Sequence, residues 1–390
     1  MQIRLFAPAL ALMVMGWGSN QFAPLVVTYQ LHAGLSVTDA QMLFVVSTAG
    51  LVPGLFLGGM ASDRMGRRRV VLWSLGLLGL STGVLWVSTA GGASLAGLTA
   101  GRLLAGLASG MGFSAGAAWV KECAVGAHGP RQAVTAMTLG FSGGPLVAGV
   151  IAAAWPAHFG LAYAPHALLT LITLTVVGLG TQGEPIRAAS QAAAAARAGI
   201  LRDPVFRRVV VPLAPWVFLT ASVALATIPG ALRAGAGTAL PWFVALVTPL
   251  PALTGVLVQR LMVRLQERLC TQLRWGFVFC TLGLALGTAA VGLQSMTLGL
   301  MACAVLGMAY GVCQTIGMQL IARLSPPAQL GRSTAIYQTL TYLGYLAPLP
   351  IAALSRHVPL PFILLALTVA AALTGVWLLA QLRHLAHARA

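Results

Sequence analysis

Long stretches without a charged residue recur along the whole chain and constrain how it can fold. Each stretch is about 20 residues long, the length that an α-helix needs to cross the roughly 30 Å hydrocarbon core of a bilayer. Hydropathy predicts twelve such spans. To within about four residues, they cover 5–29, 40–60, 70–90, 95–119, 132–154, 163–180, 209–230, 240–262, 275–293, 297–322, 333–353 and 361–381.

The composition excludes an ordinary soluble domain. Hydrophobic residues make up 58% of the chain, charged residues make up 7%, and the mean hydropathy is +0.88. A soluble domain needs more charged surface than this composition provides. We therefore predict an all-α, polytopic membrane protein with twelve transmembrane helices.

Basic residues fall almost entirely in loops on one side of the predicted membrane, the side that holds both termini. Of the 23 Lys and Arg residues, the exceptions are Arg102 inside a span and Arg233 and Arg356 on the opposite side. The positive-inside rule then places both termini in the cytoplasm of a bacterial-type inner membrane. The net charge of +17 reflects this topology and attraction to membrane lipid. We expect no nucleic-acid partner.

The N-terminus has some features of a secretory signal peptide, with a short basic region at 1–4 and an apolar core at 5–16. It lacks a small-x-small cleavage site, and apolar residues continue to Val27. We therefore predict a first transmembrane helix here.

The five cysteines form no CxxC pair and have no metal-ligand spacing. They fall in predicted spans or cytoplasmic loops, where disulfides are disfavoured. We expect them to pack among other side chains, and we expect neither a metal nor another cofactor.

A polar segment near the middle divides the chain into two halves. The segment covers 181–208 and contains five arginines. We predict an N-terminal six-helix bundle at 1–180, a cytoplasmic linker at 181–208 and a C-terminal six-helix bundle at 209–390. The halves echo each other weakly, since 59–64 aligns with 255–260. Such halves are typical of a transporter with its binding site near the membrane midplane.

Glycines at four-residue spacing predict close packing between helices. Gly50, Gly54 and Gly58 form one such face in the second span, and Gly106 and Gly110 form another in the fourth. Because the chain contains 45 glycines, single instances of this spacing also arise by chance.

The loop between the second and third spans contains Gly59, Asp63, Arg64, Gly66, Arg67 and Arg68. In this spacing they resemble G-x-x-x-D-R-x-G-R-R, the first signature of the major facilitator superfamily. The resemblance extends over the whole chain through the number of helices and the two halves. It implies the major facilitator fold, with two pseudo-symmetric six-helix bundles.

Two further motifs are similar to motifs of the same family. The fourth span carries Arg102-x-x-x-Gly106. The fifth span carries a motif typical of exporters in the superfamily, made by Gly140, Gly144, Pro145 and Gly149. The second-half copy of the loop signature departs from the pattern, with Gln259 in place of Asp.

The resemblance implies that the loop signature acts as a conformational latch. In the family's arrangement, Asp63 faces the start of the eleventh span near Ser333 and Thr334, whose free amides carry partial positive charge. Arg67 and Glu122 would pair with this latch and tune it. The alternative is that the arginines only anchor the loop at the membrane surface, but anchoring does not require Asp63.

The fifth span is predicted to act as a gate. Pro145 removes one backbone donor, and Gly140 and Gly149 leave room for a neighbouring helix. The alternative is a proline that a membrane helix tolerates without a function.

Arg102 is the one strongly charged residue that we place well inside a span. A lone cation at this depth costs at least about 2.5 kcal/mol, so it marks a functional site and requires a partner. We predict that Asn20 or Gln21 holds it and that it faces a central cavity, where it binds an anionic group or modulates a protonatable site. The alternative is that Arg102 snorkels to the membrane interface as an anchor.

Other candidates for substrate contact come from helices that line the cavity in the family. They are Trp17, Trp216, Gln314, Tyr337, Gln338 and Tyr342. Each of these aromatic residues is more often a packing or interface residue than a ligand contact.

Proton coupling has few candidates because all six acidic residues lie at span ends or in loops. Asp39 could reach the mouth of the cavity, and His166 carries a titratable ring a few residues into the sixth span. The alternative for His166 is a residue at the membrane interface.

These observations predict a monomeric secondary active transporter that exports a small amphipathic or hydrophobic solute by alternating access, as a proton antiporter. The alternative is an uptake carrier, a uniporter or symporter, for an organic anion bound by Arg102. We expect no enzyme, because the sequence has no HExxH, GxSxG, paired carboxylates or phosphate loop. A receptor or scaffold would have no use for both the loop and the bending motif.

Overall fold

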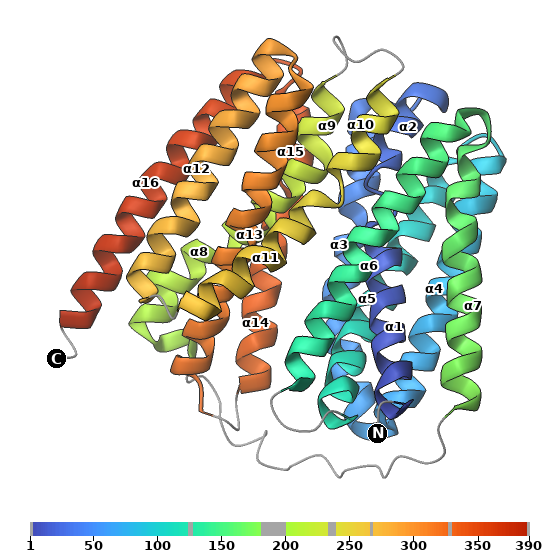
Figure 1. The fold of residues 1–390 in the computed structure, drawn as a ribbon, viewed down its shortest axis with the longest axis horizontal. Helices are drawn as coiled ribbons and strands as arrows, with labels where there is room; N and C mark the ends of the chain where they lie inside the picture. Colours follow the sequence, from blue (N-terminus) through green and yellow to red (C-terminus); the bar gives the residue numbers. More distant parts are fainter. Residues whose placement is uncertain are drawn as a thin grey trace. The chain divides into compact units, whose positions relative to one another are not determined.

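The protein is helical throughout the part of the chain that its computed structural model describes. That part comprises residues 3–123, 128–180, 200–232, 239–265, 268–326 and 330–387. Every regular element within these ranges is a helix (Figure 1), which confirms the all-α fold. The chain divides into two compact units. Unit 1 is Met1–Ala189 with Val244–Pro249, and unit 2 is Ser190–Phe243 with Leu250–Ala390.

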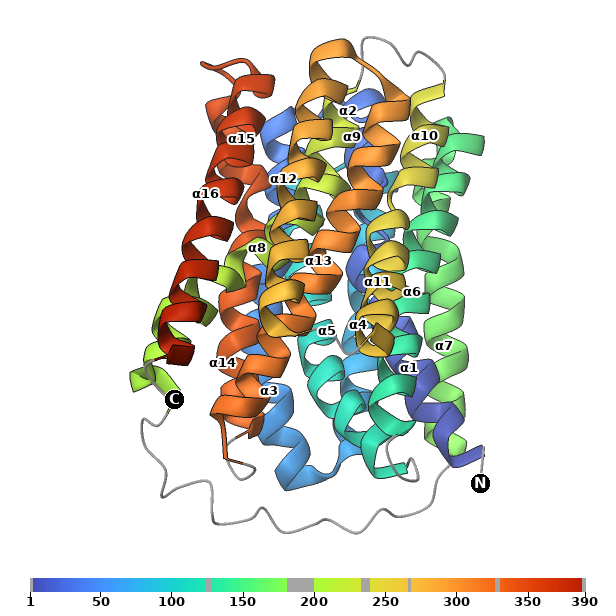
Figure 2. The same ribbon diagram turned by 60° about the vertical axis from the view of Figure 1, so that its left-hand side comes forward.

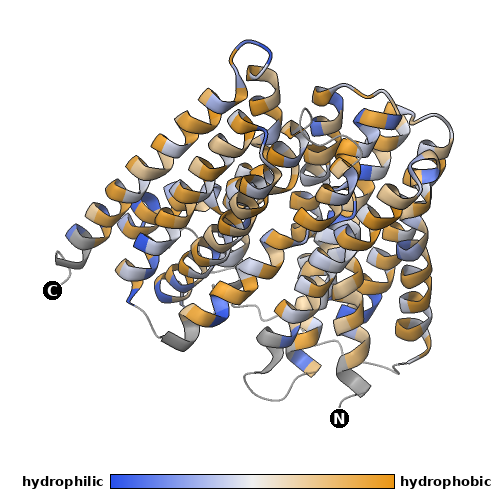
Figure 3. Cartoon of the chain, turned by 45° about the horizontal axis from the view of Figure 1, so that its top comes forward, coloured by the Kyte–Doolittle hydropathy of each residue, from blue (hydrophilic) through white to orange (hydrophobic). Residues whose placement is uncertain are grey.

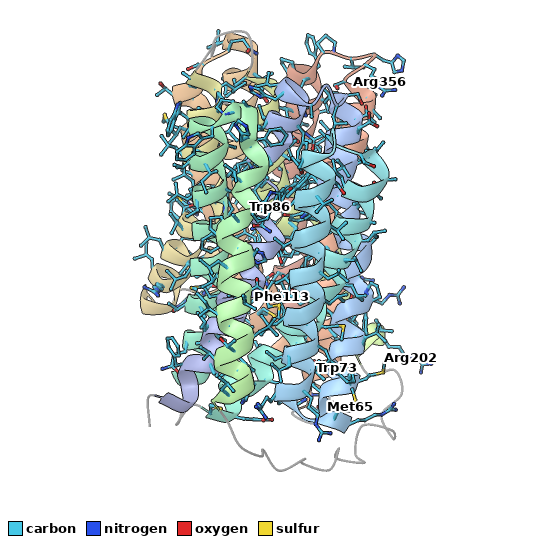
Figure 4. The ribbon with its side chains drawn as sticks, turned by 90° about the vertical axis from the view of Figure 1, so that its right-hand side faces the viewer. Met65, Trp73, Trp86, Phe113, Arg202 and Arg356 are labelled. Carbon is cyan, nitrogen blue, oxygen red and sulfur yellow. The ribbon has the colours of Figure 1, made fainter. Side chains whose placement is uncertain are left out.

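Unit 1 contains seven α-helices and one 3₁₀ segment of the described residues. They are α1 (Ile3–Asn20), α2 (Leu25–His32), α3 (Val37–Met65), α4 (Arg67–Ala90), α5 (Leu95–Cys123), α6 (His128–Ala154), η1 (Pro156–Tyr163) and α7 (Ala164–Leu179). Within this unit α3 packs mainly on α5, and α1 packs mainly on α6. Figure 4 shows α4 beside α7, with Trp73 and Trp86 at different levels of α4.

Unit 2 has more interruptions. Its helical elements among the described residues are η3 (Ile200–Arg202), η4 (Phe206–Val210), α8 (Val211–Ser222), η5 (Val223–Thr227), α9 (Ile228–Ala231), α11 (Leu250–Leu265), α12 (Leu269–Leu293), α13 (Met296–Leu324), α14 (Leu330–Leu343), η8 (Gly344–Leu346), α15 (Pro348–Leu354) and α16 (Leu360–His387). Helix α12 lies beside both α13 and α16 (Figures 1 and 2). Helix α10 (Leu240–Val247) begins in unit 2 and ends among the residues grouped with unit 1.

Eleven helical segments of the described residues are long and apolar enough to cross a membrane, from Phe6–His32 to Leu360–Leu382. They correspond to eleven of the twelve predicted spans. Figure 3 shows apolar residues along most of the length of these helices and polar residues gathered toward their ends. The remaining predicted span, 333–353, is divided among α14, η8 and α15. Of the predicted linker, residues 181–199 lie outside the described residues.

Three of the predicted spans contain a break between two helical segments. The first span breaks between α1 and α2, the eighth between α10 and α11, and the eleventh at η8. A proline lies at or just after each break, namely Pro24, Pro249 and Pro348. Proline has no N–H to donate to the carbonyl four residues earlier, so the regular helix ends near it.

Glycine permits direct contact between the backbones of α3 and α5. A Cβ atom on Gly50 would lie 2.8 Å from the amide nitrogen of Leu107, and one on Gly110 would lie 2.7 Å from that of Leu55. Neither distance leaves room for a methyl group. The close packing that the glycine spacing predicts is therefore confirmed for these two helices, and van der Waals contact between them is correspondingly extensive.

We expect Gly54→Ala to lower the free energy of unfolding by about 1–3 kcal/mol, because a Cβ at this position overlaps the backbone of α5 at Leu107. Thermal unfolding of the purified protein in detergent measures the change. Gly83→Ala on α4 is the matched control, since nothing lies within 4 Å of a Cβ built there. Equal melting temperatures for the two variants would contradict the contact.

Candidate functional site

Gly66 forms the one-residue turn between α3 and α4. Its φ is +91°, a conformation that residues with a side chain rarely adopt. Its N–H donates to the Ser62 carbonyl at 3.1 Å and so completes the end of α3. Nothing lies within 4 Å of a Cβ built at Gly66, so the backbone conformation, and not the available space, favours glycine here.

Arg67 connects three helices at this end of unit 1. Its guanidinium donates to Asp63 Oδ1 at 2.5 Å and to Ser62 Oγ at 2.6 Å, both on α3. Its Nε donates to Glu122 Oε1 on α5 at 3.2 Å. A surface ion pair contributes little by itself, but a network that shares one Arg holds its partners in a fixed geometry. The structure thus brings together Asp63, Arg67 and Glu122 of the predicted latch.

The other residues of the loop signature have separate surroundings. Arg68 donates to the carbonyls of Val177 at 3.0 Å and Gly178 at 2.6 Å. These carbonyls belong to the last turn of α7, where helix geometry leaves them without a backbone donor. Arg64 is exposed, and Gly59 has open space around it. Sequence reasoning missed the contact between Arg68 and α7. The acceptors are backbone carbonyls, which every residue type has, so the sequence does not mark them.

The predicted contact of Asp63 with the region of Ser333 and Thr334 joins residues of the two different units. It therefore stays a prediction.

Arg102 on α5 is buried, with 1% of its surface exposed. Its Nε donates to the Leu43 carbonyl at 2.9 Å, and its Nη2 donates to the Phe44 carbonyl at 3.1 Å and to Ser47 Oγ at 2.8 Å. The guanidinium carbon also lies 4.5 Å from the centre of the Phe22 ring, a cation–π geometry. Carbonyl dipoles and an aromatic face therefore surround the cation. This position does not fit the snorkelling alternative.

The break between α1 and α2 lies beside Arg102, because Phe22, whose ring contacts the guanidinium, is one of the residues of the break. Gln21 is buried, and its Oε1 has no hydrogen-bond partner among the described residues. The same holds for the indole Nε1 of Trp17, one turn earlier. Asn20 ends α1 and is partly exposed. The predicted contact of Arg102 with Asn20 or Gln21 stays a prediction.

Helix α6 continues through Pro145 as an α-helix. Gly140 faces the α1 backbone, with a Cβ built there 2.8 Å from the amide nitrogen of Trp17, and Gly144 faces the Trp17 side chain. A Cβ on Gly149 would lie 2.7 Å from the Cα of Ala245 in α10. All of these contacts lie within unit 1. The predicted gate at α6 stays a prediction.

His166 bridges three helices inside unit 1. It is fully buried on α7, with Nε2 3.2 Å from the Val14 carbonyl of α1 and Nδ1 2.8 Å from Thr82 Oγ1 of α4. A carbonyl only accepts, so Nε2 carries the proton in this geometry. Thr82 can then donate to Nδ1. The expected alternative, a histidine at the membrane interface, does not fit this burial.

Asp39 closes the first turn of α3. Its N–H donates to Ser36 Oγ at 3.0 Å, and the Ser36 hydroxyl donates to Asp39 Oδ2 at 2.6 Å. This reciprocal pair caps the helix. A role of Asp39 in proton coupling stays a prediction.

A chain of hydroxyls in unit 1 was missed by sequence reasoning. Tyr29 Oη lies 2.5 Å from Thr89 Oγ1 and 3.0 Å from Tyr163 Oη, and Thr89 donates to the Leu85 carbonyl at 2.7 Å. Every hydroxyl in this chain has a partner. The chain joins α2, α4 and η1, which are far apart in the sequence.

The candidate residues of unit 2 divide into packed and accessible ones. Trp216 contacts Phe277, with ring centres 5.9 Å apart. Tyr337 is buried and donates to the Cys313 carbonyl and Gln314 Oε1, both at 3.5 Å. Gln338 is partly exposed and lies 3.9 Å from the sulfur of Met318.

Tyr342 belongs to an aromatic cluster around Phe218. The centres of these two rings are 4.6 Å apart, with 13° between the ring planes. Tyr310 lies 5.5 Å and Tyr345 lies 5.6 Å from the same Phe218 ring. Sequence reasoning proposed Tyr342 but missed its three neighbours, although the spacing of Tyr342 and Tyr345 places both near one face of a helix.

Within the described residues, no group of three or more His, Cys, Asp or Glu side chains could hold a metal ion.

The sequence profile of the Major Facilitator Superfamily matches residues 7–348. This chain belongs to the Major Facilitator Superfamily. It is accordingly a multi-pass membrane transporter, a secondary carrier of small molecules. Two solved structures are similar to this chain. One is a D-xylose-proton symporter, with a TM-score of 0.72, 17% sequence identity and coverage of 96% of both chains. The other is a POT family transporter in complex with 5-aminolevulinic acid, with a TM-score of 0.77, 12% sequence identity and coverage of 96% of this chain and 95% of that chain. They confirm the fold of the superfamily.

Part of this chain is similar to a curated relative. It is the 3-(3-hydroxy-phenyl)propionate transporter of Escherichia coli (strain K12), 33% identical over 113 residues. The match covers 28% of this chain and 25% of the relative.

We expect Arg67→Ala to speed amide hydrogen exchange about 10- to 100-fold at the end of α3 and the start of α4, because charge-assisted hydrogen bonds of about 1.5–3 kcal/mol are lost. Exchange followed by mass spectrometry on the purified carrier measures this. Arg69→Ala is the matched control, since Arg69 lies two residues further along and is exposed. Equal acceleration by both variants would refute the network.

We expect Arg102→Lys to destabilise the carrier more than Arg102→Met does. Lysine keeps the buried charge but cannot reproduce the planar arrangement in which Nε and Nη2 reach their three acceptors, whereas methionine removes the charge together with its desolvation cost. We expect a loss of about 3–5 kcal/mol for the lysine variant. Melting temperatures in detergent test this order, and a lysine variant as stable as the original would contradict it.

Proposed function

We propose that this chain is a proton-coupled exporter that moves a small amphipathic or hydrophobic solute by alternating access. The glycine face of α6 is the observation that carries the proposal. Gly140 and Gly144 lie against α1, while Gly149 lies against Ala245 of α10. Such contacts between smooth backbone surfaces permit small shifts without side-chain repacking. The pattern resembles the motif typical of exporters in the superfamily.

Pro145 supports a bending role for the same helix. It cannot donate to the Phe141 carbonyl four residues earlier, so α6 is weakened at the level where it contacts α1. A helix weakened at one point bends there at lower cost than elsewhere. In the proposal, this bend couples α1 and α10 as the carrier changes conformation.

The second candidate function is uptake of an organic anion, which the name of the Escherichia coli relative favours. In that case Arg102 would bind the anion. The guanidinium is buried and already donates three hydrogen bonds to α3, so an anion could reach it only if the surrounding side chains moved. Because this rearrangement costs free energy, we favour export over anion uptake.

Proton coupling in the proposal rests on His166. Thr82 Oγ1 lies 3.0 Å from the Leu78 carbonyl and can donate there, so its oxygen can accept a hydrogen bond from a protonated Nδ1. Both the neutral and the protonated imidazole therefore find hydrogen-bond partners in the same place. Asp39 remains a second proton-coupling candidate.

The proposal includes the setting of the carrier. We propose a monomer in a bacterial-type inner membrane, with both termini in the cytoplasm and with the halves at 1–180 and 209–390 joined by the linker at 181–208. The distribution of Lys and Arg supports this orientation.

We expect a lipophilic cation such as tetraphenylphosphonium, or a neutral amphipathic drug, to release protons from energised everted membrane vesicles that contain the carrier. An antiporter exchanges protons in the acidic lumen for solute outside, so the pH gradient falls when the solute is added. Recovery of the fluorescence of a pH-gradient dye measures the exchange. Vesicles without the carrier are the control.

Uptake gives the opposite pattern. Intact cells would then accumulate labelled 3-(3-hydroxyphenyl)propionate, and addition of solutes to everted vesicles would leave the pH gradient unchanged. This result would overturn export and favour the second candidate.

A further inference from the structure

The aromatic cluster of unit 2 consists of Phe218, Tyr310, Tyr342 and Tyr345. The Phe218 ring is the centre of the cluster. It stacks on the Tyr342 ring and also contacts the rings of Tyr310 and Tyr345. The four rings come from α8, α13, α14 and η8, three regions of the sequence that meet in one unit. Such a cluster packs apolar surface efficiently, but packing alone does not explain the features below.

Three of the four rings are partly exposed, and two of these lie near the middle of membrane-spanning segments. Phe218, Tyr310 and Tyr342 are partly exposed. Phe218 lies near the middle of the span Phe206–Ala231, and Tyr310 near the middle of Met296–Leu324. Tyrosines of the interfacial belt lie near span ends, so a belt position does not account for these residues.

Two hydroxyls of the cluster are available for hydrogen bonding. Among the described residues, no hydrogen bond joins the Tyr310 or the Tyr342 hydroxyl to another group, and neither oxygen is one of the fully buried polar atoms that lack a partner. Both hydroxyls are therefore accessible as well as unpaired within the described residues. By contrast, Tyr29 and Tyr163 of unit 1 are buried with their hydroxyls bonded. Tyrosines that serve packing in this protein are thus satisfied internally, and these two are not.

The backbone around the cluster is irregular on both sides of Phe218. Before and after α8, the segments η4 and η5 are π-helical, and the Ile228 N–H donates to the Val223 carbonyl five residues earlier. Short π-helical segments within α-helices occur frequently at functional sites.

The eleventh predicted span is interrupted at the same cluster, between Tyr342 and Tyr345. A Cβ on Gly344 would lie 2.5 Å from the amide nitrogen of Leu219, so η8 and α8 are in backbone contact. Ser222 Oγ donates to the Gly344 carbonyl at 3.2 Å. Interrupted helices at membrane depth are where carriers place their binding sites.

We propose that this cluster binds the ring of the transported solute, and that the solute is a small aromatic compound with one hydrogen-bond-accepting group, such as a carboxylate or phenol. Phe218 and the stacked Tyr342 provide a planar apolar surface on which an aromatic ring stacks or makes edge contacts. The hydroxyls of Tyr310 and Tyr342 donate to the polar group. The inference rests on the proposed function only in that the chain carries a small organic solute.

The test is equilibrium binding to the purified full-length carrier in lipid nanodiscs, which requires neither transport nor a proton gradient. The probes are 3-phenylpropionate, 3-cyclohexylpropionate and D-xylose. We expect 3-phenylpropionate to bind at least ten times more tightly than its cyclohexyl analogue, which has the same carboxylate but no aromatic ring. Tighter binding of the pentose, or equal binding of the two carboxylates, would overturn the assignment of substrate class.

Three variants locate the site. We expect Phe218→Leu to weaken 3-phenylpropionate binding more than tenfold, and Tyr342→Phe, which keeps the ring and removes the hydroxyl, to weaken it severalfold. Phe279→Leu is the matched control, because Phe279 stacks on Trp275 of α12 outside the cluster, at 5.8 Å between ring centres. We expect its affinity to be unchanged. Unchanged binding in Phe218→Leu, with a melting temperature equal to that of the control, would overturn the site.

The outcomes separate this inference from the proposed function. Ring-dependent binding with no proton exchange in everted vesicles would support the site and contradict export. Proton exchange driven by a non-aromatic solute, with no effect of Phe218→Leu, would support export and overturn the site.

Discussion

The need to pair every backbone polar group inside a bilayer governs this structure. An α-helix pairs them internally, which is why nearly every described residue of the apolar stretches is helical. Where a helix ends or breaks, a side chain supplies the missing partner. Arg68 donates to the last carbonyls of α7, and Ser222 donates to the Gly344 carbonyl at the break in the eleventh span. Polar side chains are therefore placed where the backbone requires them.

Two contrasting groups of polar side chains remain once those requirements are met. Arg102, His166 and the hydroxyl chain around Tyr29 have partners from neighbouring helices and hold unit 1 together. Among the described residues, the hydroxyls of Tyr310 and Tyr342 have no hydrogen-bond partner, and Tyr342 lies just before the irregular segment η8. Groups of the first kind stabilise helix packing, and groups of the second kind are available to a solute.

The sequence predicted the spans well because each depends on its own composition. It could not predict the breaks at 21–24 and Gly344–Leu346, since other prolines, such as Pro53 and Pro145, lie inside continuous helices. Whether a proline ends a helix depends on which neighbour compensates for the missing donor. The partners of Arg102 could not be predicted either. Two of them are the backbone carbonyls of Leu43 and Phe44, and every residue type has a backbone carbonyl. The loop signature was recognisable because Gly66 needs its positive φ and Arg67 needs its acidic partners.

The surroundings of Arg102 bear on how unit 1 moves. A cation balanced by one carboxylate could release it with a single proton transfer, but this cation is balanced by carbonyl dipoles of α3 and the face of Phe22, which do not titrate. The backbones of α3 and α5 are also in direct contact at Gly50 and Gly110. Both features tie α3 to α5 at any pH at which the helices are intact. Helices α3 and α5 should therefore move together, and conformational change should concentrate in elements with fewer fixed contacts, such as the interrupted spans.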